Sequence, residues 1–469
     1  MKKFLFYFFL IFFAVSSSFC QSESIFGTIE FKDGEFIELE NGIKCYILNT
    51  DTEFVHIYAY IKAGRNCELE NERGISQIVF EALKRSGGKI YNSQKIKELV
   101  KSKAISLDFF FDGEFVQISV VALKKDVEES LSIIKDILFN GNLSETAIEE
   151  AKNFLINFSR KGKKPIYFET KTDLYKLLYG ENAVEAFELS KIPFYKIDNQ
   201  KVLNFYKKYY VPANCYLGIG SSIETIKNEE MVKKIFSTIP LSKKESCPYP
   251  DKPDNESLVL ILQKTGLQKS LVGVGKKLNI PSSEKLIEEL PIVELIFASV
   301  YSDSPYSRLI RQFKVERELS EEVSFNYYLS NNPRKGYFVV FANPESKKTG
   351  FSLYIVGRVF SDLVLNPPKD DELNMAKAAL IGNVNYILSS PQMLLKSNME
   401  FILRGLPPNY LKKYCQVIAN ASSSDIERIA KEYFSIGKYQ YVIFGSSENF
   451  YKEMEFFGKV YLKNASIDE

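Results

Sequence analysis

The feature that most restricts how this chain can fold is an internal repeat. The segment AKNFLIN at 151–157 matches AKAALIG at 376–382, an offset of 225 residues. The segment FYKKYYVPANCYLGIGSS ends at Ser222, and its counterpart IAKEYFSIGKYQYVIFGSS ends at Ser447, which is the same offset. Because two separate matches share one offset, coincidence explains them poorly. Each half of the chain is therefore expected to be a copy of one folded unit.

A polar segment between the two copies marks the expected domain boundary. The stretch LSKKESCPYPDKPDNES at 241–257 is rich in Lys, Ser, Pro and acidic residues, which is typical of an exposed linker. The 469 residues also exceed the size of one ordinary domain. We predict a signal peptide at 1–20, an N-terminal domain at 25–240, the linker at 241–257 and a C-terminal domain at 258–469.

Strand and helix patterns are mixed within each copy. Residues 54–64 alternate in character, which predicts a strand that is buried on one face, and residues 115–123 read as another strand. Residues 125–138 carry apolar side chains at helical spacing, and 144–161 form a second helix with Ser144 as its N-cap. Hairpin-like strands with separate helices predict an α+β fold, in which each half is an α/β sandwich of an antiparallel-type sheet packed on helices.

The N-terminus has the pattern of a secretory signal. A basic MKK precedes the apolar run FLFYFFLIFFAV, and the small residues of SSSFCQ follow. The run is too short for a membrane-spanning helix, which needs roughly 20 apolar residues. Cleavage is expected after Ser18 or Cys20. A lipid anchor on Cys20 is the less favoured alternative, because Phe19 is bulky where a small residue is usual. We expect an exported protein of the periplasm, the cell envelope or the medium.

Charge and cysteine content argue against several classes of function. Loss of Lys2 and Lys3 with the signal leaves 59 basic and 59 acidic residues, without a long basic stripe, so nucleic-acid binding is not expected. No second apolar run approaches membrane length, so no transmembrane helix is expected. The five remaining cysteines are widely spaced and form neither a disulfide framework nor a cysteine zinc site. They are Cys45, Cys67, Cys215, Cys247 and Cys415. A single disulfide between two of them is the alternative that the sequence leaves.

The stretch GISQIVFEAL at 74–83 is the clearest amphipathic helix of the first half. Its apolar residues recur at positions i, i+3, i+4, i+7 and i+8 and form a core-facing stripe. They are Ile75, Ile78, Val79, Ala82 and Leu83. The opposite face carries Gln77, Phe80 and Glu81. In H-x-x-E-H helices the same spacing places two histidines on zinc and a glutamate beside the attacking water.

The order of such segments resembles the pitrilysin/insulinase-type zinc peptidases, the inverzincins, over almost the whole mature chain. LENGIKCYIL at 39–48 is similar to the opening strand of that family, and IKAGRNCELENERGISQIVFEAL to its strand, acidic loop and motif helix. ELIFASVYSDSPYSRLIRQFKVEREL at 294–319 resembles a second-half stretch. DELNMAKAALIGNVNY, GLPPNYLKKY and SSSDIERIAKEYF resemble the C-terminal helices in their usual order. The resemblance implies two homologous halves that form a clam-like pair.

The positions that carry catalysis in the family hold other residue types in this chain. The resemblance places Gln77 and Glu81 at the two histidines, Phe80 at the catalytic glutamate and Asn157 at the third ligand. The chain has one histidine, His56, so a two-histidine site is impossible, and His56 itself is expected to be structural. A weak oxygen-only cation site of Gln77, Glu81 and Asn157 is disfavoured. We therefore expect no catalytic residue, no metal site, no zinc and no other cofactor.

Two further family elements suggest where peptide could bind. The resemblance places Lys314 at a substrate-holding arginine, with Glu318 at a glycine and Glu321 at a tyrosine, and a surface or ion-pair role for Lys314 is favoured. ISLDFFFDG at 105–113 resembles the substrate-pairing edge strand. Its side chains Phe109, Phe110 and Phe111 are either peptide contacts or core residues, and both interpretations stay open. LVGVGKK at 271–277 lacks a phosphate-loop spacing and reads as a strand end.

Three functions follow from these expectations. The favoured one is a non-catalytic subunit that pairs with a zinc-bearing homologous peptidase and helps to enclose extended peptide substrates. The alternative is a stand-alone exported peptide-binding or scaffold protein with the same fold. An active metallopeptidase is disfavoured, because its ligands and base are missing.

Overall fold

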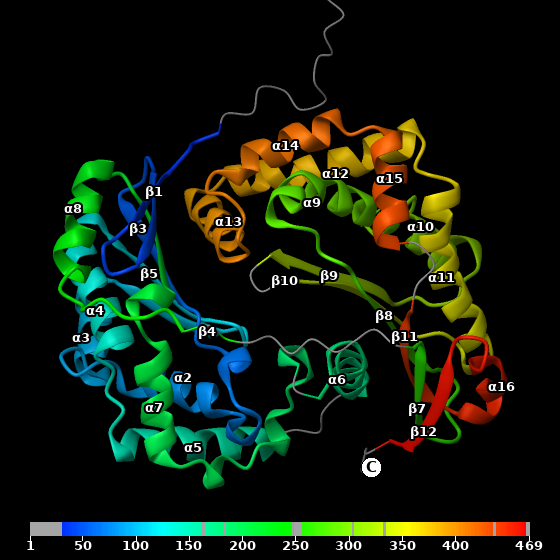
Figure 1. The fold of residues 1–469 in the computed structure, drawn as a ribbon, viewed down its shortest axis with the longest axis horizontal. Helices are drawn as coiled ribbons and strands as arrows, with labels where there is room; N and C mark the ends of the chain where they lie inside the picture. The colour runs from blue at the N-terminus through cyan, green and yellow to red at the C-terminus, as the bar shows by residue number, and fades with distance from the viewer. Residues whose placement is uncertain are drawn as a thin grey trace, which may run out of the picture.

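Two six-stranded mixed sheets, one in each half of the chain, organise the structure (Figure 1). The computed structural model describes residues 31–160, 166–181, 183–245, 247, 256–302, 304–331, 334–434 and 438–465. The predicted signal peptide at 1–20, with Cys20, lies outside the described residues, and so does most of the linker predicted at 241–257.

The first sheet has the strand order β1-β2-β6-β3-β5-β4. Its strands are β1 (Glu35–Glu38), β2 (Lys44–Asn49), β3 (Phe54–Ile61), β4 (Ser106–Phe111), β5 (Val116–Leu123) and β6 (Cys215–Ser221). Strands β2 and β6 are parallel and the other neighbours are antiparallel, so the sheet is mixed rather than purely antiparallel. The parallel pair arises because β6 comes from the end of the half and is inserted between β2 and β3.

The first half contains the three helices predicted above and, among the described residues, four further ones. They are α2 (Ile75–Ser86), α3 (Ser93–Lys103), α4 (Val127–Phe139), α5 (Glu145–Arg160), α6 (Ile166–Tyr179), α7 (Asn199–Tyr209) and α8 (Thr225–Phe236). The helix predicted at 144–161 begins at Glu145, and the Ser144 hydroxyl accepts a hydrogen bond from the Ala147 N–H at 3.3 Å, as an N-cap does. The apolar stripes of α2 and α4 are buried against the sheet in one core.

The second sheet has the order β12-β7-β11-β8-β10-β9, in which five strands repeat the first sheet, whereas the edge strand β12 follows β11 in the chain and is parallel to β7. Its strands are β7 (Leu258–Gln263), β8 (Leu271–Lys277), β9 (Val323–Asn331), β10 (Arg334–Ala342), β11 (Gln440–Gly445) and β12 (Lys459–Asn464). The helices are α9 (Ser283–Val300), α10 (Arg308–Ile310), α11 (Thr349–Leu365), α12 (Asp370–Leu388), α13 (Pro391–Leu403), α14 (Tyr410–Asn420), α15 (Ser423–Phe434) and α16 (Tyr451–Met454). A π-helical turn, η8 (Arg311–Glu316), follows α10. The segment 271–277, expected to be a strand end, is the complete central strand β8.

Each half contributes one helix to the sheet of the other half. Helix α6 of the first half packs against β8 and β11, and α13 of the second half packs against β6. Both helices lie between the two sheets (Figure 1). Their lengths and positions in the chain correspond, because the repeat offset carries Ile166 onto Pro391. Helix α6 lies inside the predicted N-terminal domain at 25–240, yet its side chains form a core with the second sheet.

Glycines in the two receiving sheets make room for these helices. A Cβ atom on Gly218 of β6 would lie 2.7 Å from Met399 Cγ of α13, and one on Gly275 of β8 would lie 3.0 Å from Leu178 Cδ1 of α6. Such distances are closer than side chains tolerate in a packed interior. The glycines of CYLGIG and LVGVG therefore serve helix packing.

Helix α13 also explains why β3 is buried on both faces. The sequence predicted a strand with one buried face, and that prediction is wrong for Tyr58 and Tyr60, which are only 5 % and 1 % exposed. These tyrosines belong to the core that contains the residues of α13. Additional bonds join the halves nearby, because the Tyr46 hydroxyl lies 2.6 Å from Asn409 Oδ1 and the Asn409 side-chain N–H donates to Gly34 O at 2.9 Å.

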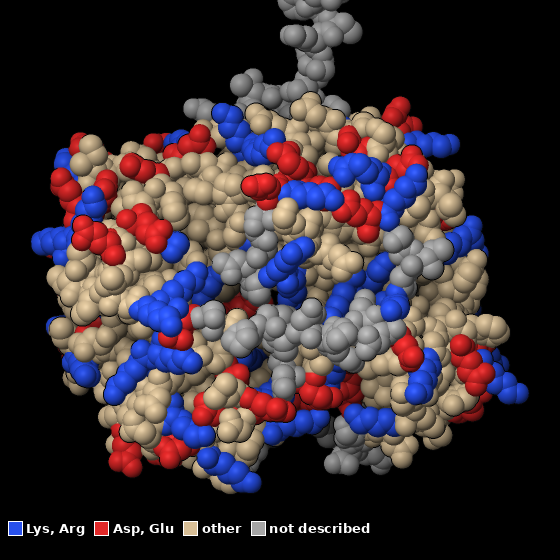
Figure 2. Space-filling model, in the orientation of Figure 1, with Lys and Arg blue, Asp and Glu red and all other residues tan. Residues whose placement is uncertain are grey.

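Charged side chains of both signs share the visible surface of the molecule (Figure 2). Lys and Arg side chains are intermingled with Asp and Glu over the face shown in Figure 2. Within the described ranges, no helix is both long enough and apolar enough to cross a membrane.

Candidate functional site

Helix α2 is held at its N-terminus by an acid from the preceding loop. Gly74, whose φ of +94° is in the left-handed region, leads into the helix. The Glu68 carboxylate accepts from the N–H of Gly74 at 2.9 Å and from the N–H of Ser76 at 3.0 Å. These bonds satisfy N–H groups that a helix leaves unpaired at its start. Burial raises the pKa of Glu68.

The position expected for a catalytic base is filled by an aromatic pair. Phe80 is 5 % exposed and stacks on Phe111 of β4, with 5.4 Å between the ring centres. The two rings join the helix to the edge strand of its sheet. Phe80 therefore contributes packing at this position and offers no group that could move a proton.

Gln77 lies beside a cation rather than beside a second ligand. Arg65 donates from Nη2 to Gln77 Oε1 at 3.4 Å, and its guanidinium lies 4.1 Å from the ring centre of Phe187 and 5.0 Å from that of Phe111. Burial lowers the pKa of Arg65 to about 10. A stacked guanidinium next to Gln77 repels a divalent cation at this place.

Glu81 is paired with a cation of its own helix, and Asn157 faces solvent. The buried Glu81 carboxylate lies 3.5 Å from Arg85 Nε, and burial raises its pKa. Arg85 in turn lies over the ring of Phe154, 3.7 Å from its centre. Asn157 is exposed on α5. Glu81, which the resemblance places at the second ligand position, is thus engaged in an ion pair within α2.

This donor set does not fit a zinc ion. Zinc sites use histidine, cysteine and carboxylate ligands, whereas these four positions supply two amides, one phenyl ring and a carboxylate that is paired with arginine. In the described parts of the chain, no three His, Cys, Asp or Glu side chains are grouped to hold a metal ion. His56 lies half-buried on β3, away from this group, and burial lowers its pKa.

A cavity of about 540 Å³ lies where the two halves meet. Tyr60 and the β4–β5 hairpin line it from the first half, and Tyr328 of β9 and the end of α13 line it from the second. Charged side chains of both signs reach it. The basic ones are Lys62, Lys244, Lys396 and Arg404, and the acidic ones are Asp112, Glu114, Glu245 and Glu400. Burial lowers the pKa of Lys62 to about 8 and raises that of Asp112 to about 6.

The three phenylalanines of β4 have different surroundings. Strand β4 is an edge strand that pairs only with β5 among the described strands. Phe109 and Phe111 pack against the first core, whereas Phe110 is 56 % exposed and lines the cavity between the halves. The alternation along the strand thus directs Phe110 toward the cavity and its two neighbours toward the core.

Sequence reasoning missed a buried lysine that holds the β4–β5 hairpin to the second sheet. The Lys335 side chain on β10 is 0 % exposed and forms ion pairs with Glu185 and, at 3.7 Å, with Glu114. Tyr328 donates to Glu114 Oε2 at 3.1 Å. The sequence carried no signal for this network, because its acids and its lysine lie in different halves and form no motif.

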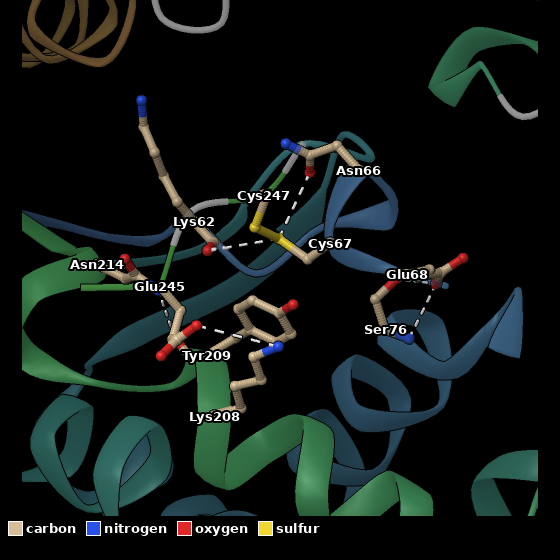
Figure 3. Close-up of a disulfide and its surroundings, with 10 residues drawn as sticks. All are labelled: Lys62, Asn66, Cys67, Glu68, Ser76, Lys208, Tyr209, Asn214, Glu245 and Cys247. Carbon is tan, nitrogen blue, oxygen red and sulfur yellow. Dashed lines mark hydrogen bonds and ion pairs between the residues drawn. A yellow bond between two sulfur atoms is a disulfide. The ribbon is translucent and has the colours of Figure 1, made fainter. Parts of the chain in front are cut away.

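A disulfide joins the described end of the linker to the loop before α2 (Figure 3). It connects Cys67 with Cys247, and Cys247 also lines the cavity between the halves. Glu68, the residue after Cys67, is the acid that holds the start of α2 (Figure 3). The bridge thus attaches the linker beside both helix α2 and the cavity between the halves.

The second-half element expected from the resemblance is only partly preserved. Lys314 is exposed on η8 and is not among the residues that line the cavity between the halves. Glu318, at the expected glycine, has a φ of +48°. The backbone of Glu318 therefore has the left-handed conformation that suits glycine, the residue type that the resemblance implies at this position.

Comparison with family models assigns both halves to one peptidase family. Residues 45–162 match the model described as Insulinase (Peptidase family M16), and residues 196–380 match the one described as Peptidase M16 inactive domain. The chain is 19 % identical over 397 residues to the Non-peptidase homolog YmxG of Helicobacter pylori, which covers 83 % of this chain and 88 % of that protein. It is 26 % identical over 265 residues to the Mitochondrial-processing peptidase subunit alpha-1 of Dictyostelium discoideum, covering 55 % of this chain and 39 % of that one.

Solved structures have the same fold. A peptidase M16 inactive domain from Pseudomonas fluorescens superposes with a TM-score of 0.76 at 16 % identity, covering 88 % of this chain and 98 % of that one. A structure described as a protease from Helicobacter pylori gives a TM-score of 0.74 at 16 % identity, covering 88 % of this chain and 100 % of that one. The chain therefore shares its two-half α+β arrangement with these proteins.

Proposed function

This chain belongs to the insulinase family of peptidases, family M16, as a non-catalytic member, and from that premise we propose that it is the non-catalytic subunit of a two-chain peptidase. Its partner in this proposal is a zinc-bearing homologue that supplies the chemistry. The role of this chain is to help enclose an extended peptide. The proposal includes that the chain itself holds no zinc.

The observation that carries the proposal is the cavity between the halves, with the free edge of β4 beside it. An edge strand offers unpaired backbone groups, and an extended peptide can add to it as a further strand. Phe110 and cavity charges of both signs are placed to contact the side chains of such a peptide. These features support a peptide-binding surface beside β4 in a chain whose expected catalytic positions hold other side chains.

The pairing with another chain is supported by the relatives. Two of the similar proteins are named as subunits, alpha-1 and beta, of the Mitochondrial-processing peptidase. A family in which named subunits occur makes a two-chain assembly a reasonable state for a member without catalytic groups. The alternative of a stand-alone exported peptide-binding or scaffold protein rests on the same cavity and needs no partner.

We also propose that the protein is exported. The basic and apolar N-terminal segment supports this location, and so does the disulfide between Cys67 and Cys247, because disulfides persist in oxidising compartments. The periplasm, the cell envelope and the medium are all compatible with these two observations.

The test is affinity purification of the tagged full-length chain from the envelope of its own cells. Zinc content and peptide cleavage are measured on the purified complex and on the chain alone. The proposal expects an inert, zinc-free chain that co-purifies with a zinc-bearing homologue able to cleave peptides. A chain that purifies alone and inert would favour the stand-alone alternative, and one that binds zinc and cleaves peptides alone would overturn both.

A further inference from the structure

A second cavity, of about 670 Å³, lies inside the C-terminal half between α9, β9 and α12. Aromatic side chains form one wall. The ring of Phe297 lies 4.5 Å from that of Tyr327 and 5.0 Å from that of Phe325, centre to centre. Tyr327 is 37 % exposed, so this wall is accessible from solvent.

This cavity occupies the place that corresponds, in the first half, to the group of Gln77, Phe80 and Glu81 on α2. Strand β9 is the edge strand of its sheet as β4 is of the other, and α9 follows β8 as α2 follows β3. Helix α12 corresponds to α5 through the repeat offset. In the first half this place is filled by stacked rings and by the ion pair of Glu81 with Arg85. In the second half the same place is open.

The floor of the cavity carries a carboxylate without an ion-pair partner. Glu294 of α9 accepts a hydrogen bond from the Tyr414 hydroxyl at 2.7 Å and is also bonded by Tyr327. Among the described residues no lysine or arginine forms an ion pair with it, and the charge of Arg404 acts on it only through space. Burial raises the pKa of Glu294, because its charged form is poorly solvated there.

The other charges around the cavity are already neutralised. Arg308 donates to Glu372 from Nε at 2.6 Å and from Nη2 at 2.9 Å, which is a two-pronged pair. Arg311 lies 3.1 Å from Glu316. Glu294 is therefore the charge in this cavity that a ligand can complement.

We propose that this cavity binds an organic cation, an ammonium or guanidinium group on an apolar stem, which pairs with Glu294 and lies against the ring of Tyr327. A carboxylate beside aromatic rings is the combination that attracts such a cation, since the rings attract positive charge and cover the stem. The cation comes either from the basic side chain of a peptide that adds to the free edge of β9 or from a free amine. This inference does not depend on the proposed pairing with a peptidase.

Calorimetric titration of the full chain with three probes tests the proposal. The probes are an extended peptide with one central lysine, the same peptide with norleucine in its place, and n-butylammonium chloride. The lysine peptide is expected to bind at least tenfold more tightly than the norleucine peptide. If n-butylammonium competes with the lysine peptide at equal concentration, the ligand is a free amine. If only the peptide binds, the cation is a side chain.

Two variants connect the binding to this cavity. Glu294→Gln keeps an acceptor for the Tyr414 hydroxyl and should remove the preference for lysine over norleucine, whereas Glu284→Gln at an exposed position of the same helix should leave it unchanged. Tyr327→Leu keeps the carboxylate and should weaken binding of the lysine peptide severalfold. This second variant tests the proposal if Glu294→Gln does not fold. Equal binding of the two peptides by the wild-type chain, or an unchanged preference in Glu294→Gln, would overturn the proposal.

Discussion

At the scale of single residues, the positions that the resemblance assigns to catalysis hold groups that pack and pair. Phe80 stacks on Phe111, Gln77 accepts from Arg65, and Glu81 pairs with Arg85. The sequence predicted the helix that carries these three side chains, and only the resemblance assigns them to catalytic positions. Their partners were not, because Arg65 and Phe111 come from a loop and a strand whose distance from the helix only the fold determines.

The backbone conformation of Glu318, which the resemblance places at a glycine position, can be tested by substitution. Its backbone is left-handed, which costs a non-glycine residue about 1 kcal/mol or slightly more. Glu318→Gly should therefore raise the free energy of unfolding by about 1 kcal/mol, measured by urea denaturation. Lys314→Gly, in the adjoining helical turn, is the control and should lower it by about 1 kcal/mol. A loss of stability in Glu318→Gly would show that the conformation at this residue differs.

Lys335 should be important for stability because its removal takes a buried cation away from Glu114 and Glu185, whose side chains are only 14 % and 17 % exposed. Breaking a buried ion pair by removing one partner costs about 3 kcal/mol, so Lys335→Met should lower the free energy of unfolding by about that amount. The triple variant with Glu114→Gln and Glu185→Gln should recover most of the loss, because the two carboxylate charges are removed together with the cation. Equal stability of Lys335→Met and wild type would contradict the buried network.

At the scale of elements, the repeat predicted two copies but not the exchange of helices between them. A repeat reports which segments are alike, and it contains no information about which copy of the sheet a helix covers. The strongest hint was the glycine pattern of CYLGIG and LVGVG, since a strand that lacks side chains on one face leaves space for a neighbour. The one-sided pattern of β3 was misleading, because its tyrosines pack under the exchanged helix α13.

The exchange makes Gly218 a sensitive position. Gly218→Ala places a methyl group 2.7 Å from Met399, which forces the Met399 side chain or α13 itself to shift and should cost about 1–3 kcal/mol of unfolding free energy. Gly382→Ala is the matched control, because a Cβ there meets no atom within 4 Å and alanine favours the helix. Urea denaturation of both variants separates the two effects. A Gly218→Ala variant as stable as the control would exclude close packing of α13 on β6.

At the scale of the whole molecule, the two halves are joined by several independent links. They include the exchanged helices, the Lys335 network, the bonds of Asn409 and the disulfide of the linker. The two-half α+β arrangement was predictable, because the repeat and the alternation of patterns both indicate it. The cavities were not, because each is lined by residues that lie far apart in the chain and share no motif.

The disulfide should contribute measurably to the stability of the whole chain. It closes a separation of 180 residues, and bridges that close long loops typically contribute about 2–4 kcal/mol. The double variant Cys67→Ser/Cys247→Ser should lose about that amount in urea denaturation. Reductant should lower the stability of the wild type to the same level and leave the double variant unaffected. A reductant effect that persists in the double variant would place the responsible bridge elsewhere.

The central claim is that the fold is retained while the chemistry resides on another chain. Zinc bound per molecule of the isolated chain, measured by elemental analysis after incubation with zinc and gel filtration, tests it most directly, with peptide cleavage assayed on the same sample. We predict zinc far below one ion per chain and no cleavage. One tightly held zinc ion per chain together with peptide hydrolysis would contradict the claim.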